Sequence, residues 1–219
     1  RRVTVIVNPV PVINSHTLDT TALCTGSTLN IDVSGTPTGT VYNWVVINAV
    51  GAQVAGGVTS GSSTSGDISV VLEATNPTAA GTIQFEITPV RNGCTGNPVQ
   101  TAVVTVHPTP GTPIPTPIFE ICSGEPTNIS VNTSPMIAGT NIQWTVVNVQ
   151  NVTGASDGSA TVPYTINQVL TNSSTQVGYV TYRVTSELNG CTGATTDYIV
   201  RVNPAPVVSL TGGTICINT

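Results

Sequence analysis

Residues 82–96 read TIQFEITPVRNGCTG, and residues 179–193 read YVTYRVTSELNGCTG. Both stretches end in Asn-Gly-Cys-Thr-Gly, and their cysteines lie 97 positions apart (191 − 94). Ahead of that motif, apolar side chains alternate strictly with polar ones, which predicts strands with one buried face. Asn-Gly between two such strands predicts a tight β-hairpin. The residues expected to face a core are Ile83, Phe85, Ile87, Val180, Tyr182 and Val184.

Other landmarks recur at nearly the same interval. Trp44 and Trp144 are 100 positions apart, and three proline-rich segments each follow an apolar alternating run, at residues 8–11, 108–110 and 203–206. A period near 97 residues is too long for a solenoid unit and fits one small domain per repeat. Such short proline segments are stiff, extended joints. The sequence is therefore expected to be part of a tandem array. Its expected parts are 1–9, the last strand of a preceding repeat; 10–107, the first repeat; 108–203, the second; and 204–219, the start of a following one.

The fold class predicted for each repeat is all-β. Val, Ile, Thr, Ser, Asn, Gly and Pro dominate, and helix signals are nearly absent. About seven short strands, with a tryptophan in the third, describe an immunoglobulin-like β-sandwich. Gly51–Gly66 is expected to be a loop or an irregular edge. The expected strands are Ser27–Val33, Val41–Ile47, Ile83–Ile87 and Thr101–Val106, then Thr127–Asn132, Asn141–Val147, Val180–Val184 and Thr196–Val202.

Composition argues against two classes of partner. Only 7% of the 219 residues are charged, lysine is absent, and ten acids against five arginines give a net charge of −5. Such a surface repels phosphate backbones and anionic headgroups, so neither nucleic acid nor membrane is an expected partner. No run of 18 apolar residues is present, so membrane insertion is not expected either. The N-terminal RRVTVIVNP matches the closing strand of a repeat better than a signal peptide, so an export signal is expected outside this sequence.

No catalytic or metal-binding pattern emerges. His16 and His107 are the only histidines, they occupy non-equivalent positions, and no Cys-His or zinc-type spacing exists. Carboxylates are scattered, without a calcium-loop pattern, so no cofactor is expected, with structural calcium through Asp157 as the open alternative. Trp44 and Trp144 could be sugar-stacking platforms, but their matching place in the third strand favours the core. We expect no enzyme activity.

Several motifs follow one another in a fixed order. They are VNP-x-P, x-C-x-G, Y/I-x-W, NVTGAS, Asn-Gly-Cys-Thr-Gly and a closing VNP. This order resembles the PKD-like and Ig-like repeats of Bacteroidetes cell-surface proteins, above all the SprB-type gliding-motility adhesins exported by type IX secretion. The resemblance implies an extracellular filament attached to the outer membrane. The first repeat departs from it, because Gly51–Gly66 replaces the equivalent of Asn151–Ala160. Asp19-Thr20-Thr21 resembles an O-glycosylation motif of these bacteria, with Thr20 as the modified residue.

Five cysteines in an exported array call for disulfides. Cys24 precedes the strand Ser27–Val33, and Cys94 lies in the turn after Ile83–Ile87. Because these strands run in the same direction, the two cysteines should lie about 23 Å apart, well beyond the roughly 4.4–6.8 Å between bridged Cα atoms. In a head-to-tail array, that turn faces the start of the first strand in the preceding domain. We therefore predict a Cys24–Cys191 disulfide across the joint. Partners outside this sequence are expected for Cys94, Cys122 and Cys216.

Alternatives to this pairing and to the leading function stay open. The other pairing is Cys24–Cys94 with Cys122–Cys191, and free thiols are a third case. The expected function is that of structural stalk repeats in a secreted, surface-anchored filamentous adhesin, for gliding motility and surface attachment. Neighbouring repeats and a polysaccharide or other surface would be its partners. The alternative function is an accessory carbohydrate-binding module of a secreted polysaccharide-degrading enzyme. A third function is a domain that contacts a ligand through Gly51–Gly66.

Overall fold

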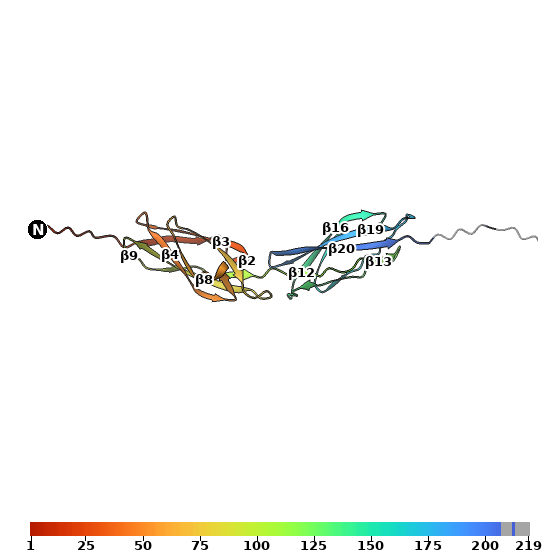
Figure 1. Ribbon diagram of the computed structural model, residues 1–219, viewed down its shortest axis with the longest axis horizontal. Coiled ribbons are helices and arrows are strands. Elements are labelled where there is room, and N and C mark those ends of the chain that lie inside the picture. The colour runs from red at the N-terminus through yellow and green to blue at the C-terminus, as the bar shows by residue number, and fades with distance from the viewer. Residues whose placement is uncertain (207–211, 213–219) are drawn as a thin grey trace, which may run out of the picture. The chain divides into compact units, whose positions relative to one another are not determined.

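The computed structural model describes residues 1–206 and 212, and within them the regular secondary structure consists of β-strands and one short 3-10 turn. Contacts divide the chain into two compact units, each coloured along the sequence in Figure 1. Unit 1 comprises Arg1–Gly111, Pro135–Thr140 and Ser186–Gly193, and unit 2 comprises Thr112–Ser134, Asn141–Thr185 and the chain from Ala194. Cys216 and most of the predicted start of a following repeat lie outside the described residues.

Unit 1 is a sandwich of two sheets, as the alternation predicts. Its smaller sheet has the strand order β1-β3-β7-β5, and its larger sheet has the order β2-β11-β8-β4-β6, with β9 and β10 also paired to β8. The smaller sheet contains β1 (Val12–Leu18), β3 (Ser27–Thr36), β7 (Asp67–Ala74) and β5 (Ala52–Val54). The larger contains β2 (Ala22–Cys24), β11 (Val104–His107), β8 (Gly81–Arg91), β4 (Val41–Val50), β6 (Ser60–Ser63), β9 (Cys94–Thr95) and β10 (Val99–Gln100).

The core of unit 1 lies between these sheets. Leu29, Ile31 and Leu72 from the smaller sheet are fully buried against side chains of the larger one. Trp44 contacts Phe85 edge to face, with ring centroids 5.8 Å apart. Burial of this kind contributes about 1.5–3 kcal/mol for each large side chain. The inward faces of β3, β4, β7 and β8 therefore stabilise the first repeat.

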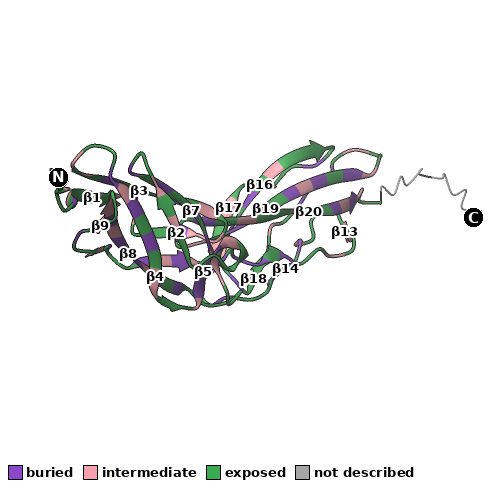
Figure 2. Ribbon diagram, turned by 60° about the vertical axis from the view of Figure 1, so that its left-hand side comes forward, coloured by how far each residue is buried: buried purple, intermediate pink, exposed green. Residues whose placement is uncertain are grey.

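Unit 2 repeats the arrangement with shorter outer strands. Its main sheet has the order β13-β20-β19-β16-β17, and two small sheets pair β12 with β15 and β14 with β18. Buried and exposed residues alternate along β19 in Figure 2. The strands are β12 (Thr112–Pro113), β13 (Phe119–Cys122), β14 (Ile129–Val131), β15 (Thr133–Ser134), β16 (Asn141–Gln150), β17 (Gly158–Thr161), β18 (Tyr164–Ile166), β19 (Gly178–Leu188) and β20 (Cys191–Asn203).

The predicted fold class is confirmed, but some predicted elements are wrong in detail. Of the two expectations for Gly51–Gly66, the irregular edge is confirmed and the loop is wrong: the segment contains β5, a 3-10 turn at Ala55–Gly57, and β6, and these two short strands lie at the edges of their sheets. The strand predicted from Thr101 begins at Val104, because Thr101 Oγ1 accepts a hydrogen bond from Phe85 N (3.1 Å) and donates one to Ala102 O (2.9 Å). Residues 1–11 contain no strand within this chain, and the assignment of 1–9 to the end of a preceding repeat stays a prediction. Most other predicted strands extend by a few residues beyond the expected bounds.

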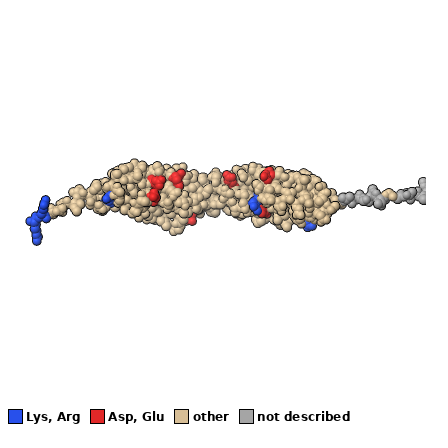
Figure 3. All heavy atoms as spheres, turned by 90° about the horizontal axis from the view of Figure 1, so that it is seen from above, with Lys and Arg blue, Asp and Glu red and all other residues tan. Residues whose placement is uncertain are grey.

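Charged side chains are sparse on the face shown in Figure 3, where most of the surface is formed by other residues. Arg183 and Asp197 form an exposed ion pair across β19 and β20, with Nε and Oδ1 2.9 Å apart. Asp197 has a pKa below its ordinary value, because Arg183 donates hydrogen bonds to its carboxylate. Exposed pairs of this kind add little stability.

Candidate functional site

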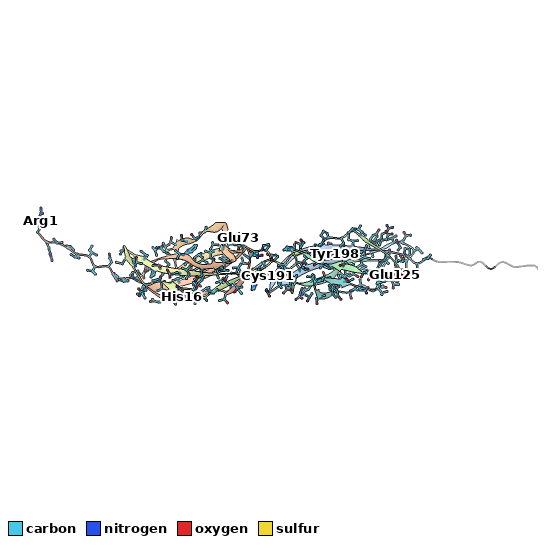
Figure 4. The ribbon with its side chains drawn as sticks, turned by 90° about the horizontal axis from the view of Figure 1, so that it is seen from below. Arg1, His16, Glu73, Glu125, Cys191 and Tyr198 are labelled. Atoms are coloured by element: carbon cyan, nitrogen blue, oxygen red, sulfur yellow. A yellow bond between two sulfur atoms is a disulfide. The ribbon has the colours of Figure 1, made fainter. Side chains whose placement is uncertain are left out.

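The chain contains one disulfide among its described residues, between Cys24 and Cys191, with Cα atoms 5.6 Å apart. This is the pairing predicted from strand direction. Cys24 ends β2, and Cys191 begins β20, where Figure 4 labels it. Ser186–Gly193, which includes Cys191, belongs by its contacts to unit 1, although in sequence it is part of the second repeat.

Strand pairing positions Cys24. β2 runs parallel to β11, and Cys24 lies opposite His107. The backbone N–H of Thr25 then donates to His107 O at 2.8 Å, which extends the ladder by one bond. Cys24 is therefore held at the start of the proline joint, where β11 ends.

The Asn-Gly turn positions Cys191. Asn189 (φ 52°) and Gly190 (φ 78°) both have positive φ, as a type I′ hairpin turn requires. Asn189 Nδ2 lies 3.3 Å from His107 Nδ1, and Ser186 Oγ donates to Gly111 O at 2.7 Å. A Cβ at Gly193 would collide with Ser186 Oγ and with Pro110 O. Residues 107–111 therefore hold the turn that carries Cys191.

The same arrangement recurs around Cys94. Asn92 (φ 46°) and Gly93 (φ 78°) form the equivalent turn, and Asn92 Nδ2 lies 3.4 Å from Asn8 Oδ1. A Cβ at Gly96 would overlap the carbonyl oxygen of Pro11. The half-buried Cys94 thiol is free and donates to Asn8 O at 3.9 Å. Segment 8–11 thus packs on this turn as segment 107–111 packs on the turn that carries Cys191.

Cys122 occupies the position in unit 2 that Cys24 occupies in unit 1. β13 runs parallel to β20, with Cys122 opposite Asn203. Ser123 N donates to Asn203 O at 2.9 Å, as Thr25 N does to His107 O. The Cys122 thiol is free and exposed.

The two tryptophans lie in the core, where their position predicts them. Trp44 and Trp144 are 7% and 6% exposed, so neither offers a face to a sugar. Trp144 Nε1 donates to Ser156 O at 3.1 Å, and its ring stacks on Tyr164 with centroids 5.5 Å apart. The six residues expected in the core beside them are all fully buried: Ile83, Phe85, Ile87, Val180, Tyr182 and Val184.

A glycine opposite each tryptophan was not expected from the sequence. Gly61 of β6 pairs with Trp44, and Gly158 of β17 pairs with Trp144. A Cβ would come within 2.6 Å of the Trp44 ring at Gly61 and would overlap the Trp144 ring at Gly158. The only signal in the sequence is a glycine in a short Ser-rich segment after each tryptophan.

The remaining candidate residues do not gather into a site. Within residues 1–206 and 212, no group of three or more His, Cys, Asp or Glu side chains could hold a metal ion. Asp157, the calcium candidate, accepts a hydrogen bond from Val146 N at 2.7 Å. Thr20 Oγ1 donates to Ala22 O at 2.7 Å. No helix in this part of the chain has the length and apolar character needed to cross a membrane.

Known proteins similar to this chain include several two-domain or multi-domain structures. The chain is similar to the D0-D1 domain of Intimin (TM-score 0.33, 11% identity, 86% of this chain and 99% of that one). It is similar to Sidekick-1 immunoglobulin domains 1–5 (TM-score 0.37, 15% identity, 88% of this chain and 39% of that one). It is also similar to the Bacteroides ovatus mixed-linkage glucan utilization locus protein SGBP-B, solved with a mixed-linkage heptasaccharide (TM-score 0.29, 15% identity, 90% of this chain and 48% of that one). No curated protein sequence matches the chain.

A family model matches most of the chain, in two copies. The PKD-like domain matches residues 21–110 and residues 119–206. Each match begins just before or at the strand that carries Cys24 or Cys122 and ends in a proline joint. The chain therefore belongs to the PKD-like domain family.

Proposed function

We propose that this chain is a pair of stalk repeats in a secreted, surface-anchored filamentous adhesin, which serves gliding motility and attachment to surfaces. Tandem PKD-like and Ig-like domains are typical of structural or adhesion repeats, and this fold is typically non-catalytic. A disulfide is typical of proteins that work outside the cell. The attachment to an outer membrane and the gliding role extend the proposal beyond these general properties.

The observation that carries the proposal is the disulfide between two PKD-like segments. Cys24 lies in the first matched segment and Cys191 in the second, so the bond links the two domains covalently. Residues 25–190 all lie within the loop that this bond closes. A force applied to the two ends of the chain passes from Cys24 to Cys191 through the sulfur atoms and does not extend the residues within the loop. A filament under tension needs this protection for its repeats.

The proline joint contributes to the same property. His107 lies opposite Cys24 and contacts Asn189, in the turn before Cys191. Gly111 O accepts a hydrogen bond from Ser186 of the same hairpin. Residues 107–111 are therefore held against the turn that carries Cys191 by hydrogen bonds as well as by the disulfide. A native disulfide adds about 2–4 kcal/mol to stability, and the hydrogen bonds contribute on the order of 1 kcal/mol each.

The experiment that tests the function uses Fab fragments raised against the folded chain. Applied to intact cells of the source organism, they should label the surface and reduce both attachment to glass and gliding speed. Fab fragments against an unrelated outer-membrane protein provide the control. Labelling only after the cells have been permeabilised would contradict the proposal.

The alternative is an accessory carbohydrate-binding module, and the buried tryptophans argue against it. Such modules bind sugars through exposed aromatic faces, whereas Trp44 and Trp144 are both buried. Affinity electrophoresis of the purified chain through gels that contain soluble glucans, xylan or mannan separates the two functions. Stalk repeats should migrate unretarded in every gel, and retardation in any one would favour the module.

A further inference from the structure

We infer that Cys94 and Cys122 are half-sites for two further disulfides of the Cys24–Cys191 type. Cys94 would bond to a strand cysteine of a preceding repeat, and Cys122 to the Asn-Gly-Cys turn of a following one. The inference rests on the proposed function, since it requires that repeats of this kind adjoin the two described here. It deepens that function, because it makes every joint of the stalk covalent.

The surroundings of Cys94 match those of Cys191 at three points. Both cysteines follow an Asn-Gly turn with positive φ at both residues. In both, the turn asparagine meets the residue before the joint proline, Asn8 in one and His107 in the other. In both, a glycine two residues after the cysteine lies against a joint proline carbonyl. The turn at Cys94 therefore already has the geometry of the turn at Cys191, and its free thiol lies beside Asn8.

Residues 5–8 indicate where the strand that carries the partner cysteine of Cys94 would lie. Val5 and Val7 correspond to Val104 and Val106 of β11, which are both fully buried, and β11 pairs with β2 from Thr105 to His107. Val5 and Val7 are instead 77% and 86% exposed, with no strand beside them. A strand like β2, laid parallel to residues 6–8, would place its cysteine opposite Asn8, as Cys24 lies opposite His107. That is the position from which Cys24 reaches Cys191.

Cys122 provides the complementary half. Its register against Asn203 and the hydrogen bond from Ser123 N to Asn203 O repeat those of Cys24 and Thr25 at His107. Asn203 precedes Pro204, as His107 precedes Pro108. An Asn-Gly-Cys turn that packs on residues 203–206 would therefore bring its cysteine to Cys122, whose thiol is exposed and free.

The bond forms by thiol–disulfide exchange. The thiolate of one cysteine attacks a disulfide donor, such as an oxidoreductase of the dithiol–disulfide class or oxidised glutathione, and forms a mixed disulfide. The second thiolate then displaces the donor thiol. The two protein thiols lose two electrons to the donor and two protons to it or to water.

A tandem chain supplies both halves at one joint. It consists of residues 1–203 followed directly by residues 9–219, so that Asn203 takes the place of Asn8 before Pro9. Cys94 of the first copy, and Cys122 and Cys216 of the second, are changed to serine. The first copy's Cys122 and the second copy's Cys94 are then the only cysteines outside the two Cys24–Cys191 pairs. The chain is refolded in a glutathione redox buffer, and the monomer that carries both Cys24–Cys191 disulfides is purified.

The expected result is a peptide that links Cys122 of the first copy to Cys94 of the second, found by non-reducing proteolysis and mass spectrometry. Alkylation of these two thiols by iodoacetamide should fall at least tenfold relative to the 219-residue chain. In the control, Cys122→Ser in the first copy leaves Cys94 of the second alkylated. Two alkylated thiols in the purified monomer would overturn the inference. The adhesin function would then stand or fall separately, on the Fab experiment.

Discussion

The cross-strand pairs Trp44–Gly61 and Trp144–Gly158 show how single residues fix the edge of each sandwich. The indole lies over its partner strand in the space that a side chain would otherwise occupy, so the glycine is required by packing and not by a turn. A protein interior is close-packed, and one extra methyl group at such a contact forces the ring or the strand to move.

Gly158→Ala should therefore destabilise the chain by about 1–3 kcal/mol, the usual cost of overpacking a core. Urea unfolding followed by tryptophan fluorescence measures the change. Ser159→Ala, at the exposed neighbouring position of β17, is the matched control and should stay within about 0.5 kcal/mol of the parent. Equal stability of the two variants would mean that the Trp144 ring does not lie on Gly158.

Ionisation of Tyr182 is expected to lower the free energy of unfolding at alkaline pH. Burial raises its pKa to about 12, and its hydroxyl donates to Gln168 Oε1 at 2.9 Å. Because the folded pKa exceeds the unfolded value of about 10, the contribution is fully present below pH 10 and is lost as the pH rises towards 12. The total is about 2–3 kcal/mol. Tyr182→Phe, which gives this position the residue that the first repeat has at Phe85, should flatten the decline between pH 10 and 12. Urea midpoints at pH 8 to 12 that fall equally in parent and variant would contradict this assignment.

At the scale of elements, the hairpins at residues 92–96 and 189–193 each join a turn to a proline segment. The turn is specified locally by Asn-Gly, and the close approach is permitted by the glycine two residues after the cysteine. Gly193 therefore serves two purposes, because it admits Pro110 O and leaves Ser186 free to bond Gly111 O. Each hairpin therefore packs directly against a proline segment that lies about 80 residues earlier in the sequence.

Gly193→Ala should push the hairpin away from residues 110–111 and slow formation of the Cys24–Cys191 disulfide. We expect the oxidised fraction at early times in a glutathione buffer to fall severalfold, measured by quenching with iodoacetamide and mass spectrometry. Thr192→Ala, exposed on the same turn, should oxidise at the parent rate. Identical rates for both variants would show that the packing of Gly193 does not position Cys191.

The sequence predicts those strands that a local residue pattern specifies, and it misses those that form only through pairing with a neighbouring strand. Strict alternation placed Ile83–Ile87 and Val180–Val184 in strands with the correct face inward. Strand direction also led to the Cys24–Cys191 disulfide. By contrast, β5 and β6 lie in a Gly- and Ser-rich segment with low strand propensity, and they form because β7 and β4 offer free edges. The glycines opposite the tryptophans were missed for the same reason, since only the cross-strand register reveals their role.

For the whole molecule, the Cys24–Cys191 bond sets how far the chain can be stretched. The bond spans 167 positions, which nearly exhausts both repeats. A fully extended chain gains about 3.3–3.6 Å per residue, so the loop holds back about 550–600 Å of length. Both sandwiches can thus lose their folded structure without lengthening the chain by that amount.

Single-molecule force spectroscopy, with handles at the two chain ends, tests this directly. Under oxidising conditions the chain should show no extension from residues 25–190, and dithiothreitol should add about 550–600 Å of contour length. Cys24→Ser should show the long extension in both conditions. Cys122→Ser, which removes a thiol that is free in this chain, should behave as the parent does. Long extensions in the oxidised parent would show that the bond does not form in solution.

The distance in sequence between Cys24 and Cys191 also sets the order in which the molecule is completed. In a chain that is synthesised and exported from its N-terminus, Cys24 emerges long before its partner and must wait as a thiol while 166 further residues follow. The disulfide at Cys24 then forms only once the last hairpin of the second repeat has folded. Until Cys191 arrives, the Cys24 thiol is therefore open to oxidants and thiol-blocking agents, which will act on it during the interval between the arrival of one cysteine and the other.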